Sequence, residues 1–335
     1  MSRPDLRMAK LAGIPRGITR ALLFLCFLCL AASLVILVAC RPEKREDDEK
    51  GRSAPRELVD LDSRIVDYAR KATDRKPYTP PSDEERKQIA QGVGHLLDGD
   101  AARAEELFAT AGFHLSRLTD AASGRRYDEV AARKPGPRER WGRLYVNADA
   151  EVRWSVQVPH PVSDSGTEHL GARLLEETPR GALVLAGAHR TAGRGDAADV
   201  AHRTDSVFHA VVAEMHKRAI PGVQLHGFAK GRDRPYDAIL STGAARSATG
   251  SATRLADSMK DRDLRVCRSW SDRCPLEGTT NVQGEDAKRR SGTFVHAELS
   301  PSARNEGNEG SEGKQTQARS ALRELLVGWS ENAPR

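Results

Sequence analysis

The stretch Val152–Gly171, VRWSVQVPHPVSDSGTEHLG, decides the fold because it joins a strand, a polar loop and the start of a helix. Alternating apolar residues predict the strand, and two prolines end it: Val152, Trp154, Val156, Val158, Pro159 and Pro161. His160 lies between the prolines, Asp164 follows in the loop, and a helix is expected to begin near Glu168. Because open α/β sheets bind ligands at the carboxyl ends of their strands, we expect a functional site here.

Runs that are apolar on both faces alternate with helical patterns after this stretch. The predicted strands are 181–188, 223–228, 236–241, 264–270 and 293–299, and the predicted helices are 168–177, 198–219, 251–260 and 316–329. Strands buried on both faces are typical of a sheet that helices cover on both sides. The sequence therefore predicts an α/β fold with a mixed, mostly parallel sheet in a domain that spans residues 113–335.

The residues before the opening stretch are predicted to form helices first and then short strands. Helical spacing predicts three helices: 57–73, 82–97 and 101–111. A capping box of Ser82 and Glu85 marks the start of the second helix. Short alternating runs over 113–151 predict an antiparallel meander that leads into the opening stretch. We therefore expect a helical N-terminal part, 57–112, ahead of the α/β domain.

Residues 1–40 have the pattern of an export segment. Basic residues precede the apolar run Ala21–Ala39, and a charged linker, 41–56, follows Cys40. The sequence Leu-Val-Ala-Cys that ends at Cys40 resembles the lipobox of bacterial lipoproteins, whereas a run of this length also suits an uncleaved membrane anchor. Both alternatives predict attachment to the cell membrane, through a lipid or a helix, with the folded part on the extracytoplasmic side.

The cysteines and the charge agree with that location. Of five cysteines, only Cys267 and Cys274 lie beyond the N-terminal segment, and in an oxidising compartment this pair predicts a disulfide. The formal net charge of +6 is diffuse, with acids interspersed among the bases and no arginine stripe that carries aromatic residues. This distribution excludes nucleic acid as the expected partner.

Polar residues that end or interrupt the buried strands are the candidates for chemistry. His160 and Asp164 follow one predicted strand, His226 lies in VQLHGF, and Glu298 lies in FVHAELS. Further candidates at strand ends and in loops are His189, Arg190, Asp199, His202, Asp205, Asn281, His296 and Arg304. Such residues are costly to bury unpaired, so each is either satisfied structurally or functional.

The order of these motifs resembles the active-site order of the zinc-carboxypeptidase-like hydrolases, and especially of poly-gamma-glutamate hydrolases and N-formylglutamate amidohydrolases. VPHP-SDSGTE, VQLHGF and FVHAELS carry this resemblance, which covers Val152–Arg304. The resemblance implies a carboxypeptidase-like fold, His160 and His226 as metal ligands, and Glu298 as the general base. The PHP-SD-TE, AHR and TNVQG pattern also resembles a group of exported bacterial proteins without an assigned function.

The acid ligand is left open between two residues. Zinc carboxypeptidases have a His-x-x-Glu motif, from which this chain departs, because Asp164 follows His160 by four residues and Glu168 follows it by eight. The DSGT segment resembles an EPGT-like segment of poly-gamma-glutamate hydrolases, which favours Asp164 and keeps Glu168 as the alternative.

The chemistry of these residue types agrees with the resemblance. Two imidazoles and one carboxylate form a three-ligand zinc site that leaves a position for water and lowers its pKa to about 7. Arg190, Arg304 or His189 are suited to hold a substrate carboxylate, and Asp199 is suited to orient a ligating histidine or to cap a helix.

We therefore expect an exported, zinc-dependent hydrolase that cleaves an amide bond in a peptide, γ-glutamyl or N-acyl substrate. One alternative is a non-catalytic protein of the same fold that binds a ligand or a cell-wall component. A second alternative is an aspartic peptidase built on Asp164.

Overall fold

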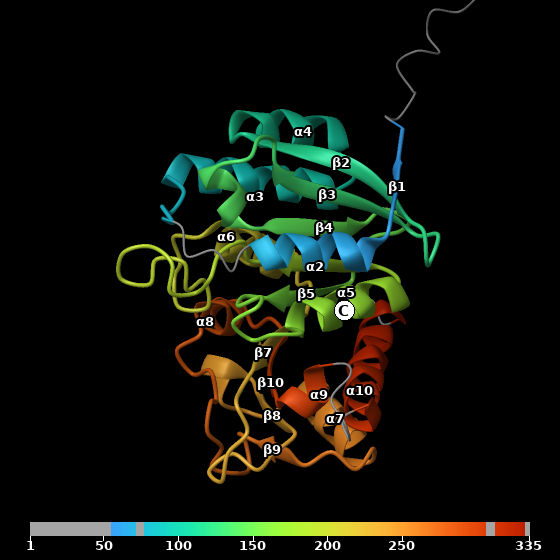
Figure 1. The fold of residues 1–335 in the computed structure, drawn as a ribbon, viewed down its shortest axis with the longest axis vertical. Coiled ribbons are helices and arrows are strands. Elements are labelled where there is room, and N and C mark those ends of the chain that lie inside the picture. The colour runs from blue at the N-terminus through green and yellow to red at the C-terminus, as the bar shows by residue number, and fades with distance from the viewer. Residues whose placement is uncertain (1–54, 72–76, 306–311, 332–335) are drawn as a thin grey trace, which may run out of the picture. The chain divides into compact units, whose positions relative to one another are not determined.

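A mixed sheet of ten strands lies within residues 55–71, 77–305 and 312–331, the residues that the computed structural model describes (Figure 1). The strand order is β1-β2-β3-β4-β6-β5-β7-β10-β8-β9. The bounds are β1 Glu57–Val59, β2 Phe113–Asp120, β3 Arg126–Ala132, β4 Arg143–Asn147, β5 Trp154–Val158, β6 Gly181–Leu185, β7 Gly222–Gly227, β8 Ala238–Ser241, β9 Val266–Arg268 and β10 Phe294–Leu299. The central strands β6, β5, β7 and β10 are parallel, and antiparallel pairing with β4 and β8 flanks them. The predicted mixed, mostly parallel sheet is confirmed.

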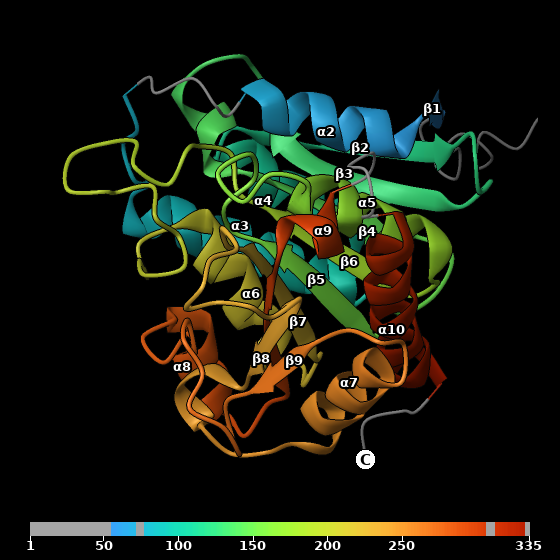
Figure 2. The same ribbon diagram turned by 60° about the horizontal axis from the view of Figure 1, so that its bottom comes forward.

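Helices cover both faces of this sheet (Figure 2). α2, α5, α7, α9 and α10 form one layer, and α3, α4, α6 and α8 form the other. Their bounds are α2 Leu61–Lys71, α3 Asp83–Leu97, α4 Ala101–Thr110, α5 Thr167–Glu177, α6 Val207–Lys217, α7 Gly250–Lys260, α8 Val282–Arg289, α9 Pro301–Arg304 and α10 Glu312–Glu331. In β6, Leu183 and Leu185 join the core under α5, whereas Ala182 and Val184 join the core under α6. Alternate residues of a buried strand thus serve both layers, as predicted.

The N-terminal part of the described chain contains the predicted helices but begins with a strand. β1 pairs in parallel with β2 at the edge of the sheet, where the sequence predicts the first turn of a helix. α2 starts only at Leu61, whose N–H donates to Asp120 Oδ1 (3.2 Å). The predicted capping box of α3 is present, with Glu85 N–H donating to Ser82 Oγ (3.3 Å) and Ser82 N–H donating to Glu85 Oε2 (2.9 Å).

Two helices and one strand pairing differ from the prediction. α6 begins at Val207 and not at residue 198, because the Ser206 hydroxyl accepts from His209 N–H (3.0 Å) and caps the helix there. α8 was not predicted, and Asn281 caps it through two backbone N–H groups of its first turn. The predicted meander forms as β2-β3-β4. Its last strand, β4, pairs with β6 and not with β5, the next strand along the chain, because β5 lies between β6 and β7.

The predicted disulfide between Cys267 and Cys274 is present, with Cα atoms 5.9 Å apart. The described residues belong to one compact unit, Pro55–Arg335. Within them no helix has both the length and the apolar character that a bilayer span requires. The export segment, 1–40, and the linker up to residue 54 lie outside the described residues, so membrane attachment stays a prediction.

A buried carboxylate joins the helical part to the sheet. Glu129 of β3 is 1% exposed and accepts hydrogen bonds from Arg64 of α2 (2.7 Å) and Arg143 of β4 (2.7 Å). Burial would raise the pKa of Glu129, but the Arg64 hydrogen bond and the charge of Arg143 outweigh it and lower the pKa. The resulting stabilisation is present at neutral pH and is lost as the pH falls through the lowered pKa.

Glu129→Leu is expected to lower the free energy of unfolding by about 3 kcal/mol, because it leaves Arg143 without its carboxylate partner and Arg64 with only the exposed Glu57. Urea unfolding at neutral pH measures the loss. Glu57→Gln removes an exposed partner of the same Arg64 and should cost no more than about 0.5 kcal/mol. Equal losses for the two variants would contradict the importance of the buried pair.

Candidate metal centre

Three neighbouring strands carry polar residues on the face that α6 and α8 cover. In the register of the sheet Gln157 of β5 lies opposite Gln224 of β7, and Gln224 lies opposite His296 of β10. Two residues further along, His226 lies opposite Glu298. The parallel strands end just beyond these residues, so the strand order itself brings His226 and Glu298 to the carboxyl edge of the sheet.

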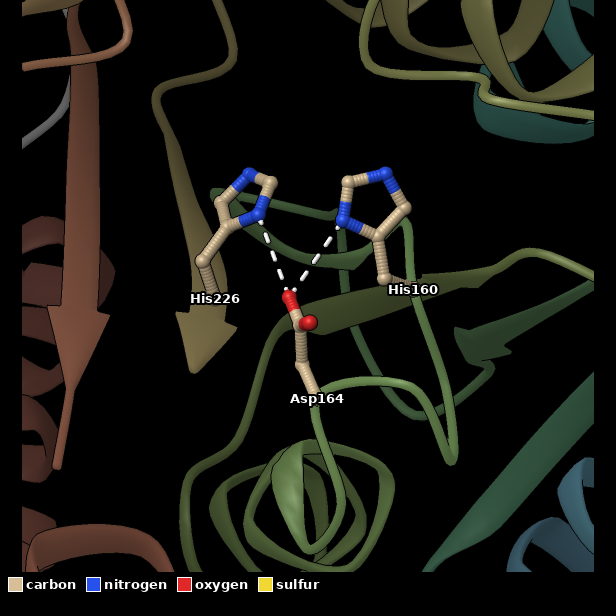
Figure 3. A group of neighbouring side chains, drawn as sticks. All are labelled: His160, Asp164 and His226. Atoms are coloured by element: carbon tan, nitrogen blue, oxygen red, sulfur yellow. Dashed lines mark hydrogen bonds and ion pairs between the residues drawn. The ribbon is translucent and has the colours of Figure 1, made fainter. Parts of the chain in front are cut away.

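His160, Asp164 and His226 converge at this edge (Figure 3). Asp164 Oδ2 lies 3.3 Å from His160 Nδ1 and 3.3 Å from His226 Nδ1. One potential ligand atom from each residue lies within 4.8 Å of the other two, and all three side chains are buried. The N–H of Asp164 donates to the carbonyl oxygen of His160 (2.9 Å), and this turn brings the two side chains together. The structure thus places both predicted histidines beside the favoured acid.

The second nitrogen of each imidazole is held from behind. His160 Nε2 lies 2.8 Å from Asp199 Oδ1, and His226 Nε2 lies 2.8 Å from Gln224 Oε1. When both Nε2 atoms donate to these oxygens, both Nδ1 atoms present lone pairs to the Asp164 carboxylate. A proton or a metal ion between these nitrogens and the carboxylate makes the contact favourable, and this donor set suits zinc. These residues therefore fit a zinc ion.

Burial and hydrogen bonding hold Asp164 and His226 in the forms that bind metals. Burial would raise the pKa of Asp164, but hydrogen bonds with His160 and His226 hold that pKa well below its usual range. Burial lowers the pKa of His226 to about 4. Burial acts in the same direction on His160, but its hydrogen bonds with Asp164 and Asp199 outweigh it and raise the pKa. An ionised carboxylate and a neutral imidazole are the forms that coordinate a metal ion.

Glu298 of β10 stands beside this group. Glu298, His296 and His226 each offer a potential ligand atom within 4.8 Å of the others, so this second group shares His226 with the first. Burial and the charge of Asp164 raise the pKa of Glu298 to about 8. A cation held by the first group would favour the ionised carboxylate. Glu298 is therefore placed to accept a proton at the edge of the metal centre.

His296 is a buried neighbour of the centre. It is 3% exposed, and its ring centroid lies 4.6 Å from that of His226. Gly278 has a φ of +61°, and a Cβ there would lie 2.7 Å from His296 Nε2. A glycine in the loop before α8 thus makes room for this imidazole.

Two of the predicted site residues contact the backbone. Glu168 Oε2 accepts a hydrogen bond from Val162 N–H (3.4 Å), so the histidines meet Asp164 and not Glu168. Arg304 of α9 donates to the carbonyl oxygens of Ser165 (2.8 Å) and Leu299 (2.8 Å). These bonds tie the loop after β5 to the end of β10, and the substrate-binding role of Arg304 stays a prediction.

Arg190 lies in the loop after β6 and contacts both Asp199 and His160. Its Nη2 donates to Asp199 Oδ2 (2.8 Å), and its Nη1 lies 3.2 Å from His160 Nδ1. His202 Nδ1 lies 3.3 Å from the same oxygen of Asp199. Asp199 therefore joins three basic side chains, in agreement with its predicted orienting role. The Arg190 side chain is 35% exposed, and its role in holding a substrate stays a prediction.

Gln224 is a further residue of the site that the sequence motifs do not include. The available signal is its position two residues before His226 in a buried strand, which places the amide on the same face as the imidazole. A buried polar side chain at that spacing indicates a hydrogen-bond partner for the histidine.

No family model and no curated protein matches this chain. Among solved structures it is similar to the metallo-carboxypeptidase from Burkholderia cenocepacia, at 13% identity and a TM-score of 0.36, covering 75% of this chain and 70% of that one. It is also similar to a Pseudomonas aeruginosa metallo-carboxypeptidase in complex with (2-guanidinoethylmercapto)succinic acid, at 12% identity, a TM-score of 0.34 and 68% coverage of each chain. A third is the succinylglutamate desuccinylase from Chromobacterium violaceum, at 15% identity, a TM-score of 0.41, and coverage of 68% and 78%. The motifs in the sequence resemble the group to which the carboxypeptidases belong.

Proposed function

We propose that this protein is a zinc-dependent hydrolase that cleaves an amide bond in a peptide, γ-glutamyl or N-acyl substrate. The observation that carries the proposal is the approach of two imidazole Nδ1 atoms to one oxygen of Asp164, with Glu298 beside them. His160, Asp164 and His226 are the proposed ligands. This arrangement supports an enzyme rather than a structural metal site, because three protein ligands leave a position for water or substrate.

The proposed chemistry divides between the metal and the side chains. When bound, zinc supplies a Lewis acid and lowers the pKa of a water molecule to about 7. Glu298 takes the proton that is released during attack on the amide carbonyl and gives it to the departing amine. Asp199 keeps the His160 ring in position, and Arg190 offers its partly exposed guanidinium to a carboxylate of the substrate. The substrate is therefore proposed to be a small molecule or a peptide.

We further propose that the protein works outside the cytoplasm, attached to the cell membrane by a lipid or a helix near Cys40. The disulfide between Cys267 and Cys274 supports an oxidising compartment. Metabolic labelling with a palmitate analogue in a bacterial host, with Cys40→Ala as the control, distinguishes the lipid anchor from a helix.

Protein purified without chelator is expected to contain one zinc ion per chain and to hydrolyse members of a panel of peptides, γ-glutamyl amides and N-acyl amino acids. A chelator should abolish the activity, and added zinc should restore it. Elemental analysis and an amine-release assay measure both outcomes.

Three other results would each overturn the proposal. Absence of stoichiometric zinc, with His160→Ala changing neither metal content nor stability, would remove the metal centre. Stoichiometric zinc without hydrolysis of any panel member would favour the non-catalytic alternative. Pepstatin-sensitive activity that survives the chelator would favour the aspartic peptidase.

A further inference from the structure

Four amide side chains lie buried around His226, none of them more than 2% exposed. They come from β5, β7 and the start of α8: Gln157, Gln224, Asn281 and Gln283. Burying an amide is costly unless its polar atoms are hydrogen-bonded, so the partners of each amide determine which end is oxygen and which is nitrogen.

The backbone at the N-terminus of α8 fixes the orientation of the Asn281 amide. Asn281 Oδ1 accepts from the backbone N–H groups of Gln283 (3.1 Å) and Gly284 (2.9 Å). Because a backbone N–H can only donate, the atom that faces it is the oxygen of Asn281. Asn281 Nδ2 therefore points the other way and donates to Gln224 Oε1 (2.5 Å).

A backbone carbonyl on the other side of the cluster fixes the orientation of the Gln283 amide. Gln283 Nε2 donates to the carbonyl oxygen of Val200 (2.9 Å), and a carbonyl can only accept. Gln283 Oε1 is therefore free to accept from Gln224 Nε2 (3.2 Å), which also donates to Gln157 Oε1 (3.1 Å). The orientations of Asn281 and Gln283 therefore require the same orientation of Gln224, with its oxygen toward His226.

We infer that Asn281 and Gln224 act as positioning residues that keep the proton of His226 on Nε2. Gln224 Oε1 lies 2.8 Å from His226 Nε2, and this oxygen can only accept. A neutral imidazole carries one N–H, so Nδ1 is left with a lone pair toward Asp164. Asp164 Oδ2 also faces Nδ1, at 3.3 Å, but the contact of Nε2 with Gln224 Oε1 is the shorter one, and it assigns the single N–H to Nε2. The value of this tautomer for zinc binding rests on the proposed function.

Two substitutions in metal-free protein test this inference. Gln224→Leu removes the acceptor, and Asn281→Asp keeps the helix cap but removes the donor to Gln224. Nitrogen-15 NMR, with the His226 signals assigned by a His226→Gln variant, is expected to report the Nε2–H tautomer in the wild type and its loss in both variants. Zinc affinity, measured by competition with a chelating dye, should fall roughly 10–100-fold in Gln224→Leu. Gln224→Glu restores an acceptor and should restore the Nε2–H tautomer.

Gln157→Leu is the matched control. It removes a buried amide that contacts the other end of Gln224, so it should lower the melting temperature while leaving the His226 tautomer and the zinc affinity unchanged. Retention of the Nε2–H tautomer in Gln224→Leu, with zinc affinity within about twofold of the wild type, would overturn the inference. If Gln224→Leu does not fold, Asn281→Asp decides by the same NMR readout. A wild type that binds no zinc would overturn the proposed function. The tautomer measurement would still decide whether Asn281 and Gln224 keep the proton of His226 on Nε2.

Discussion

Glu298→Gln is expected to lower kcat/KM for amide hydrolysis by roughly 10²–10⁴-fold while the zinc content stays at one ion per chain. The substitution keeps the size of the side chain but removes the group that accepts and returns the proton. Because Glu298 lies beside the three proposed ligands and is not among them, metal binding should persist. Steady-state kinetics and elemental analysis on the same protein preparation measure the two effects separately.

Glu214→Gln serves as the control for Glu298→Gln. Glu214 on α6 and Glu298 are equally buried, each 8% exposed, but Glu214 pairs with Lys217 and Arg218. Its substitution should change stability without changing the kinetics. Activity of Glu298→Gln within about threefold of the wild type would remove Glu298 from the proposed mechanism, because general acid–base catalysis contributes at least about 10²-fold.

Asp164→Asn is expected to weaken zinc binding by more than about 100-fold, because loss of a ligand should cost more than loss of a residue that orients one. The variant preserves the shape of the loop and removes the negative charge that both histidines face. A chelator-competition assay measures the dissociation constant, and hydrolytic activity should disappear together with the bound zinc.

Glu168→Gln is the matched control, since Glu168 is the other acid that the sequence offers as a ligand. In the structure it accepts from Val162 N–H, so its substitution should leave zinc affinity within about threefold of the wild type, below the 10–100-fold expected even for an orienting residue. The reverse result, with zinc lost in Glu168→Gln and kept in Asp164→Asn, would assign Glu168 as the ligand.

The sheet could be predicted from the sequence because its central strands are apolar runs with clear ends. The pattern of Val152–Gly171 predicts β5, the loop after it and the start of α5 nearly in their observed positions. α8 was missed because its eight residues, VQGEDAKR, show little apolar periodicity. The sequence predicts a helix start where β1 forms, since three residues at a sheet edge are too few to reveal a strand pattern.

The candidate site was only partly predictable for a different reason. The motif order identified His160, His226 and Glu298, but spacing along a loop does not say which acid turns toward the histidines. The hydrogen bond from Asp164 N–H to the His160 carbonyl oxygen decides this, and it depends on how the loop folds. The strand alternation places Gln224 on the same face as His226, but it does not show that the two side chains form a hydrogen bond.

The loop after β5 and the end of β7 supply the proposed ligands, and the segment between these two strands includes α5, β6 and α6. An unfolded chain therefore holds no preformed site, and zinc should bind almost only to the native state. At a free zinc concentration of 100 times the dissociation constant, this linkage adds about 2.7 kcal/mol to the free energy of unfolding. The melting temperature of the protein then reports how much of it has bound zinc. A rise in Tm on zinc addition measures the zinc affinity without any knowledge of the substrate.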